Sequence, residues 1–325
     1  METGELEFSF FNWVSKNLYA FASGYTLPSI EKELDEMMPQ LKRYNIESCL
    51  AVVVQFRLFI TQLRGRSDTK KYNLLGWDDT GVDSGESESC TGDISMPEQR
   101  TKIYHVKWAY WSQLQLSYYF GDYAIAKRIA DNYDSVGGKT DKSYISLALV
   151  LFFTGLTASG LARETFDGKC KSIAKKAAQK MKMIVRRSGL TSLHRYYLME
   201  ADYLLTKTTT DFKTKRVKIA TGPEKFETAK AFDRAISAVT GAGITQDIAL
   251  AHELAGEFFA RCSDESFAKH HFVEARNFYH KWGAKAKVEH LLMKHAKYFE
   301  GCKDLPLLGV DVQPQVVSFA WRATY

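Results

Sequence analysis

Apolar residues recur at every third or fourth position along nearly the whole 325-residue chain, and strict alternation of apolar and polar residues is rare. The first pattern puts apolar side chains on one face of an α-helix, whereas alternation marks a β-strand. The pattern predicts helices at about 5–22, 28–44, 46–64, 101–120, 122–134, 141–161, 168–187, 189–207, 224–241, 244–261, 264–281 and 283–300. Short joints such as Gly121–Asp122 make consecutive helices antiparallel. The expected fold class is therefore all-α.

Two of these helices repeat one another at a distance of 40 residues. Phe232 and Ala235 in one correspond to Phe272 and Ala275 in the other, and a glycine follows each helix, at Gly243 and Gly283. A small residue within a helix admits a close neighbour, and a glycine past the last turn adopts the left-handed cap conformation. Small and large residues at fixed offsets on helix pairs are typical of tetratricopeptide-like arrays. The sequence thus predicts a tetratricopeptide-like helical-hairpin solenoid.

Three segments depart from the helical pattern. Residues 65–100 contain DDTGVDSGESESCTGD, which has six acidic residues and no basic one, and are expected to form a disordered insertion. Residues 208–223 are expected to form a polar, basic loop, and residues 303–325 an irregular tail. The predicted organisation is N-terminal helical repeats over 1–64, the acidic insertion over 65–100, a helical array over 101–302, and the tail.

Composition narrows the class of protein. Apolar residues make up 45% of the chain and charged residues 25%, as in soluble globular proteins. The net charge of +6 is too weak to predict binding to nucleic acid. The five cysteines are far apart, which favours a reducing compartment over a disulfide framework or a structural zinc site. The N-terminal METGELEF lacks the features of a secretory signal, so a cytoplasmic location is expected.

A charge-free run over 145–162, ISLALVLFFTGLTASGLA, is close to the length that spans a membrane. It contains several Ser, Thr and Gly residues, and no basic cluster marks one side of it. A helix buried on most faces inside a helical array has the same composition. We therefore expect a buried helix and no membrane partner.

The stretch AHELAGEFF at 251–259 begins like the zinc-protease motif HExxH, in which two histidines one turn apart bind the metal. The second histidine is replaced by Gly256, and Glu257 lies off the required spacing. An apolar stripe that includes Leu254 and Phe258 explains the helix as a packing element. His252, Glu253 and Glu257 lie off this stripe and are expected to form a polar flank.

Other motifs are incomplete as well. SVGGKT at 135–140 ends like a phosphate-binding loop, but Tyr133 stands where its first glycine is needed. His270, His271 and His280 share a helix without a further ligand at metal-binding spacing, so packing histidines are expected. No GxSxG motif, paired-carboxylate signature or nucleotide-binding glycine loop is present. The sequence thus predicts no catalytic, cofactor-binding or metal-binding residue, no cofactor and no enzymatic activity.

The helix at 168–187, GKCKSIAKKAAQKMKMIVRR, is the strongest surface feature. Ile173, Ala177, Met181 and Ile184 form a packing stripe, and basic residues cover the rest of the helix. Two interpretations remain open. The helix has a solvated face whose lysine side chains shield the packing stripe, or it binds an acidic partner, and the chain's own segment 78–93 is one candidate for that partner. The candidate surface consists of Lys171, Lys175, Lys176, Lys180, Lys182, Arg186 and Arg187.

Several segments resemble the helical-repeat region of very large predicted signalling ATPases. They are GELEFSFFNWVSKNLYAFASG, FGDYAIAKRIADNY, LTSLHRYYLMEADYLL and ALAHELAGEFFARCSDESFAKHHFVEARNFYHKWGAKAKVEHL. Those multidomain proteins join a protein-kinase-like domain, an AAA-type or related ATPase module and a tetratricopeptide-like array, often with a GAF sensor and a histidine kinase or cyclase. The resemblance covers most of residues 4–300 and includes none of the catalytic motifs.

The resemblance therefore implies regulation or scaffolding in signal transduction and does not imply catalysis. The expected function is a non-catalytic helical-repeat module for binding protein partners or for intramolecular regulation, with the other domains of a larger signalling protein among the candidate partners. The alternative is a fragment or degenerate remnant of an ATP-dependent sensor kinase or signalling ATPase. A hydrolase that uses the His and Glu residues of 251–259 is a third, more remote class.

Overall fold

The computed structural model of the chain describes residues 3–66, 96–133, 144–188 and 192–300. Within these ranges the helices are α1 (Thr3–Ala22), α2 (Leu27–Arg43), α3 (Glu47–Leu63), α4 (Met96–Tyr119), α5 (Tyr123–Tyr133), α6 (Tyr144–Thr165), α7 (Gly168–Ser188), α8 (Leu193–Thr209), α9 (Gly222–Ala242), α10 (Thr245–Arg261), α11 (Glu265–Trp282) and α12 (Lys285–Lys294). A 3₁₀ turn, η3 (Ala296–Tyr298), follows α12. The expected all-α class is confirmed, and each predicted helix is present.

The differences from the sequence prediction lie at element ends. The last predicted helix ends at Lys294 and continues as the 3₁₀ turn. Helix α4 begins at Met96, inside the expected insertion, with Pro97 in the first turn, where its missing N–H costs little. The loop over 208–223 contains a short antiparallel hairpin, β1 (Thr210–Asp211) and β2 (Arg216–Val217). The central part of the acidic insertion, Gly137, Gly138 and the tail lie outside the described residues.

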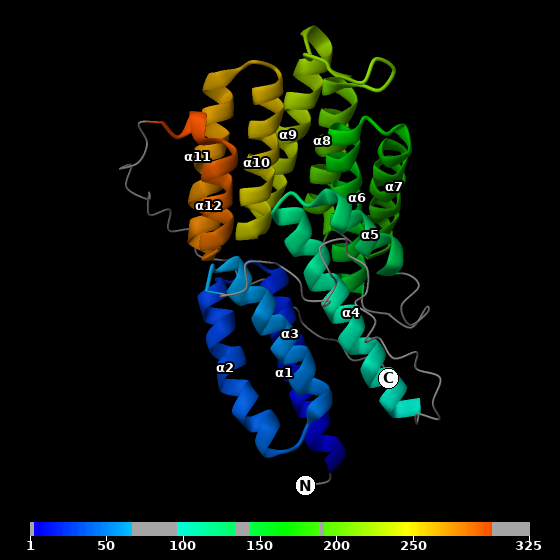
Figure 1. The fold of residues 1–325 in the computed structure, drawn as a ribbon, viewed down its shortest axis with the longest axis vertical. Coiled ribbons are helices and arrows are strands. Elements are labelled where there is room, and N and C mark those ends of the chain that lie inside the picture. The colour runs from blue at the N-terminus through cyan, green and yellow to red at the C-terminus, as the bar shows by residue number, and fades with distance from the viewer. Residues whose placement is uncertain (1–2, 67–95, 134–143, 189–191, 301–325) are drawn as a thin grey trace.

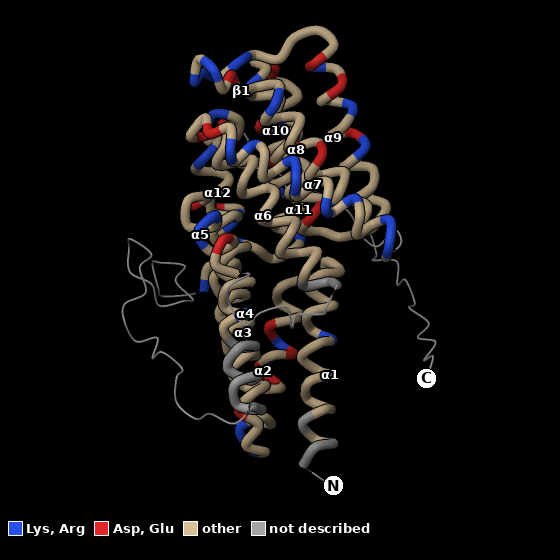
Figure 2. Tube along the Cα trace, turned by 90° about the vertical axis from the view of Figure 1, so that its right-hand side faces the viewer, with Lys and Arg blue, Asp and Glu red and all other residues tan. Residues whose placement is uncertain are grey.

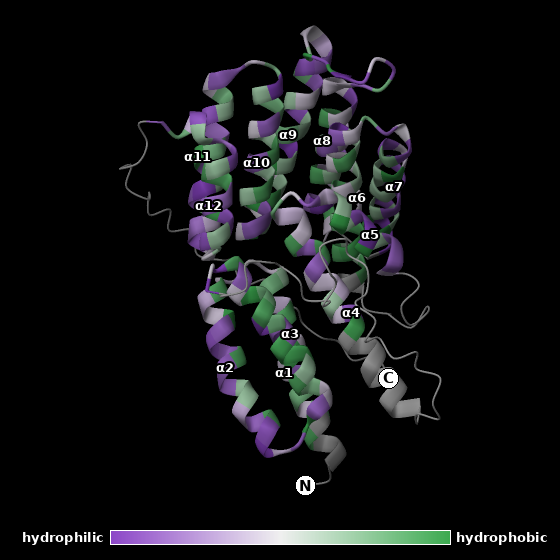
Figure 3. Ribbon diagram, in the orientation of Figure 1, coloured by the Kyte–Doolittle hydropathy of each residue, from purple (hydrophilic) through white to green (hydrophobic). Residues whose placement is uncertain are grey.

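The described helices form two groups along the long axis of the molecule (Figure 1). Helices α6 to α12 stand side by side as an array, and α1, α2 and α3 form a bundle below α10, α11 and α12. Helix α4 runs from beside the bundle up into the array, where it contacts α5 and α6. Figure 3 shows α3 as largely hydrophobic and the visible face of α2 as largely hydrophilic. Helix α3 contacts α1, α2, α4 and α12, so most of its surface is enclosed.

Aromatic rings fill the junction between the bundle and the array. Phe21 from α1 lies 5.7 Å from Trp282 of α11 and 5.7 Å from Trp111 of α4, measured between ring centroids. Trp282 also lies 5.9 Å from Tyr119 and is fully buried. Large rings that interlock between helices bury much apolar area and fix the relative position of the two groups.

Side chains from the array also satisfy carbonyl groups at helix ends near this junction. Arg195 donates to the carbonyl of Ala22 at 3.1 Å, and Gln246 donates to that of Phe21 at 2.7 Å. The last carbonyls of a helix have no partner within the helix, and a buried one without a partner is costly. These bonds therefore tie the end of α1 to α8 and α10.

The expected glycine caps are present at the ends of α9 and α11. Gly243 and Gly283 adopt left-handed conformations with φ of 69° and 90°. The corresponding rings of Phe232 and Phe272 are buried, as are Ala235 and Ala275. The interpretation of the 40-residue correspondence as packing and capping is thus confirmed for these two helices.

The charge-free run lies in α6, which contacts α4, α5, α7 and α8. Among the described residues, one helical stretch, Leu147–Thr165, is long and apolar enough to cross a membrane, and 72% of it is buried inside the protein. Its small residues explain the packing: a Cβ on Gly160 would come 2.9 Å from the ring of Tyr123, and one on Gly155 would come 3.1 Å from Ala177. A core helix of a soluble protein has the same properties.

Candidate functional site

The basic residues that the sequence singles out lie on α7, at one edge of the array (Figure 1). Ala174, Ala177 and Met181 are buried on the side that contacts α6 and α8. The predicted packing stripe is thus confirmed at its centre, and its ends, Ile173 and Ile184, are half-buried. The exposed residues of the basic surface are Lys175, Lys176, Lys180, Lys182, Arg186 and Arg187, and Lys171 is half-buried.

These seven side chains, which we call the α7 basic face, form no ion pair with any other residue that the structure describes. Two of them rest on aromatic rings: the Nζ of Lys171 lies 4.7 Å from the centroid of Phe212, and that of Lys182 lies 5.7 Å from the centroid of Tyr196. The view in Figure 2, from the side on which α7 lies, shows its Lys and Arg positions in blue. Within the described part of the chain, no carboxylate therefore neutralises the positive charge of this face.

The stretch AHELAGEFF lies in α10, and Gly256 has a packing role there. A Cβ at this position would come 2.8 Å from the ring of Phe272 on α11. The residue that replaces the second zinc-binding histidine is thus a small residue that lets a large ring approach the helix.

The expected polar flank on α10 is wrong. His252 and Glu253 are buried at 9% and 4% exposure, and the side chain of Glu257 is only 12% exposed. The reason is that α10 contacts α8, α9 and α11, so that its polar side is enclosed as well as its apolar stripe. A buried polar group needs partners, and each of these three residues has them.

His252 pairs with His271, one of the three histidines of α11 for which the sequence predicts a packing role. Their Nδ1 atoms are 3.0 Å apart, and the rings stack on Phe278 and Phe259 respectively. Burial and the neighbouring histidines lower the pKa of His252 to about 3, and burial lowers that of His271 to about 4. Both rings are therefore neutral near pH 7, with one Nδ1 as donor and the other as acceptor.

Glu253 forms the centre of a second buried cluster. Its carboxylate accepts hydrogen bonds from Tyr279 at 2.7 Å and from the Nζ of Lys287 at 2.8 Å. Lys287 also donates to the carbonyl of Tyr119 at 2.6 Å. Burial opposes ionisation of Glu253, but the charges of Lys287 and Lys294 together outweigh it and hold the pKa of this carboxyl below its usual value. The cluster joins α4, α10, α11 and α12 with opposite charges paired.

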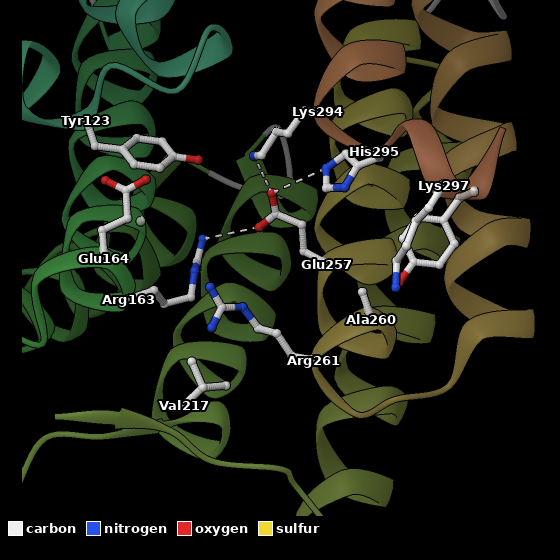
Figure 4. A pocket seen from close by; sticks show the side chains of 12 residues that line it. Tyr123, Arg163, Glu164, Val217, Glu257, Ala260, Arg261, Lys294, His295 and Lys297 are labelled. Atoms are coloured by element: carbon white, nitrogen blue, oxygen red, sulfur yellow. Dashed lines mark hydrogen bonds and ion pairs between the residues drawn. The ribbon is translucent and has the colours of Figure 1, made fainter. Parts of the chain in front are cut away.

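A pocket of about 430 Å³ opens on the next turn of α10 (Figure 4). Its walls come from α5, α6, β2, α10, α12 and η3, which are far apart in the sequence. The lining residues are Tyr123, Gly160, Arg163, Glu164, Val217, Glu257, Ala260, Arg261, Lys294, His295, Lys297 and Tyr298.

Arg163 lies at the back of this pocket with 2% of its side chain exposed. Its Nη1 donates to Asp202 at 2.5 Å and to the hydroxyl of Thr206 at 2.8 Å. Its Nη2 is buried, has no hydrogen-bond partner among the residues that the structure describes, and lies 3.9 Å from Glu257. Burial opposes the charge, but Asp202 and Glu257 raise the pKa of Arg163 above its ordinary value, so it stays cationic.

Glu257 is held mainly by Lys294. The Nζ of Lys294 donates to Glu257 at 2.7 Å, and the Nε2 of His295 lies 4.0 Å from the same carboxylate (Figure 4). Burial opposes ionisation of Glu257, but Lys294 and then Arg163 lower its pKa well below its usual range. Burial also lowers the pKa of His295 to about 4, so its imidazole is neutral near pH 7.

Arg261 extends from the last turn of α10 toward Arg163 (Figure 4). No hydrogen bond or ion pair joins its guanidinium to another described residue. Burial, followed by the nearby charge of Arg163, lowers the pKa of Arg261. Across the pocket, burial raises the pKa of Glu164, whose side chain is exposed at the rim.

Glu253, Glu257 and His295 bring ligand atoms within 4.8 Å of one another, as a metal site would require. Their surroundings favour a different role. Lys287 and Tyr279 occupy the carboxylate of Glu253, and Lys294 occupies that of Glu257. A divalent cation would have to displace two ammonium groups, and bringing it next to them is electrostatically unfavourable.

The sequence did not single out Arg163, Arg261 or Lys294. A signal for Arg163 exists: it directly follows the charge-free run, at the end of a largely apolar helix. Asp202 likewise stands among apolar residues in LMEADYLL. Charged residues at core positions of a helix need buried partners, which is a recognisable pattern, although it does not identify the partner.

No protein-family model, curated protein or solved structure matches the chain. Functional residues are therefore inferred from the chemistry of the two features described above, the α7 basic face and the charged pocket.

Proposed function

We propose that the protein is a non-catalytic, tetratricopeptide-like interaction module that binds an acidic segment of a partner protein through the α7 basic face. The observation that carries the proposal is the absence of any ion pair between these seven cations and the rest of the described chain. Most other surface cations of the described helices have acidic neighbours, such as Lys16 with Glu33 and Lys127 with Asp131. Unneutralised charge concentrated on one helix attracts a partner of opposite sign.

The architecture supports this role. Antiparallel helices in an array leave whole helix faces available at the edges, as α7 does (Figure 1). The correspondence of Phe232 and Gly243 with Phe272 and Gly283 is the pattern by which helical hairpins stack in repeat proteins. Such proteins bind partners along extended surfaces, and a role in signalling or scaffolding fits this mode of binding.

The test is binding of the full chain to a fluorescent, glutamate-rich peptide, measured by anisotropy. The variant Lys176→Glu/Lys180→Glu reverses two exposed charges one helical turn apart on α7. We expect it to weaken binding about tenfold or more, and we expect the affinity of the unaltered protein to fall as the salt concentration rises.

The matched control is Lys230→Glu/Lys269→Glu. It makes the same change of net charge at exposed lysines on α9 and α11 that have no ion pair with a described residue. It should change the affinity by less than about twofold if location matters more than total charge. Equal weakening by both double variants would mean that the peptide senses only net charge and would refute a specific site on α7.

A further inference from the structure

The charged pocket contains more hydrogen-bond donors than its own carboxylates use. Arg163, Arg261 and Lys294 line it together with Glu164 and Glu257. Lys294 is committed to Glu257, and one side of Arg163 is committed to Asp202 and Thr206. The remaining donors are the Nη2 of Arg163 and the guanidinium of Arg261.

We propose that this pocket binds a small molecule through an oxyanion, a phosphate group or a carboxylate, that is held between Arg163 and Arg261. The α7 basic face has no part in this site, so the proposal stands apart from the function proposed above.

The first supporting observation is the state of Arg163. Its side chain is almost fully buried, yet its Nη2 has no acceptor within hydrogen-bond distance in the described part of the chain. A buried donor without an acceptor is costly, and the carboxylate of Glu257 lies 3.9 Å from this nitrogen, beyond hydrogen-bond distance. An oxygen atom of a ligand in the pocket can supply the missing acceptor.

The second observation is the position of Arg261. Figure 4 shows its guanidinium beside that of Arg163, with no bonded carboxylate. Two guanidinium groups that face the same space repel each other unless an anion lies between them. An oxyanion matches their planar, forked arrangement of donors, because a carboxylate or phosphate accepts two parallel hydrogen bonds from one guanidinium.

Neither acid that lines the pocket, Glu164 or Glu257, fills this role. Glu257 is held by Lys294 at 2.7 Å, on the side away from Arg261, and Glu164 is exposed at the rim beside Tyr123. Among the described residues, Arg261 therefore has no carboxylate partner and the Nη2 of Arg163 has no acceptor.

The size and walls of the pocket indicate more than a bare ion. A volume of about 430 Å³ falls in the range of small-molecule sites. Tyr123, Tyr298, Ala260 and Val217 contribute ring or aliphatic surface to its lining. A ligand that combines an oxyanion with a compact apolar or aromatic body fits both kinds of lining.

The experiment is isothermal titration calorimetry on the full chain with inorganic phosphate, phenyl phosphate and benzoate, and with benzamide as the neutral probe. We expect at least one of the three anions to bind at a one-to-one ratio and benzamide not to bind. A preference for phenyl phosphate over benzoate identifies a phosphate ligand, and the reverse identifies a carboxylate. If none of the anions binds at millimolar concentration, the proposal is wrong.

The variant Arg261→Gln removes a cation that has no hydrogen-bond or ion-pair partner among the described residues, so folding should be unaffected, which circular dichroism checks. We expect it to weaken anion binding about tenfold or more, since a charge-assisted bidentate contact is lost. Arg261→Lys should recover part of the affinity, because it restores the positive charge without the two parallel donors of a guanidinium. Arg187→Gln, an exposed arginine of α7 outside the pocket, should leave the affinity unchanged.

Two results would overturn the assignment of the site. Anion binding that survives Arg261→Gln, or that is lost in Lys176→Glu/Lys180→Glu, would move the anion to another surface, in the latter case the α7 basic face. Stoichiometric binding of Zn²⁺ or Mg²⁺ that is lost in Glu257→Gln would replace the anion by a metal ion held by Glu253, Glu257 and His295.

Discussion

At the scale of single residues, Gly256 gives the sharpest prediction. Within a helix, alanine is normally more stable than glycine by about 0.5–1 kcal/mol. At this position, however, a Cβ would come 2.8 Å from two atoms of the buried Phe272 ring. We expect Gly256→Ala to lower the free energy of unfolding by ~1–3 kcal/mol, because overpacking outweighs helix propensity. Urea denaturation followed by circular dichroism measures the change.

Gly241 of α9 is the matched control. It is also helical, but a Cβ there would meet nothing within 4 Å. Gly241→Ala should therefore stabilise the protein by up to about 1 kcal/mol. If the two substitutions shift stability in the same direction, the ring of Phe272 does not lie against Gly256 as described.

At the scale of elements, the contact between α10 and α11 should make stability depend on pH. The pKa of His252 is lowered to about 3 by burial and its neighbouring histidines, and that of His271 to about 4 by burial. The unfolded chain takes up protons near pH 6.5 while the folded chain does not, so stability is full above that pH and is lost as the pH falls toward 4. Each histidine should contribute a loss of up to roughly 2 kcal/mol between pH 7 and pH 5.

The comparison is with His252→Phe/His271→Phe, in which phenyl rings keep the stacking on Phe278 and Phe259 but cannot be protonated. The free energy of unfolding of this variant should fall less over the same pH interval, because two of the histidines with lowered pKa no longer contribute. Urea titrations at several pH values give the free energy of unfolding of each protein as a function of pH. An equal dependence on pH in both proteins would show that the loss of stability at low pH comes from other groups.

At the scale of the whole molecule, the N-terminal bundle and the array are held together by a close backbone contact. Gly24, with φ of 88°, lies where a Cβ would come 2.7 Å from the backbone nitrogen of Thr245. We expect Gly24→Ala to destabilise the protein strongly, because a left-handed alanine costs about 1–2 kcal/mol and the clash with backbone adds overpacking of ~1–3 kcal/mol. Thermal unfolding measures the effect.

Gly121 separates the two contributions. Its φ is 83°, but a Cβ there meets nothing within 4 Å, so Gly121→Ala should cost only the conformational strain. The difference between the two variants reports on the contact between bundle and array. Equal losses would mean that the two groups of helices are not held together at Gly24.

The sequence by itself determined the helical class, the approximate position of each helix, the caps at Gly243 and Gly283, and the basic character of α7. These features depend on local spacing: a periodicity of 3–4 residues, a glycine after the last turn, and consecutive cations on a helix. Local patterns are present in the chain before any long-range contact forms.

Only the tertiary structure decided which charges meet. Arg163 reaches Asp202, and Glu253 reaches Lys287, across separate helices, and those pairings depend on how the helices are aligned against one another. The burial of His252 had the same cause. A stripe in the sequence identifies one packed face of a helix, but α10 is also enclosed on its other faces by neighbouring helices, among them α8, α9 and α11, and which helices surround it is a property of the assembled fold.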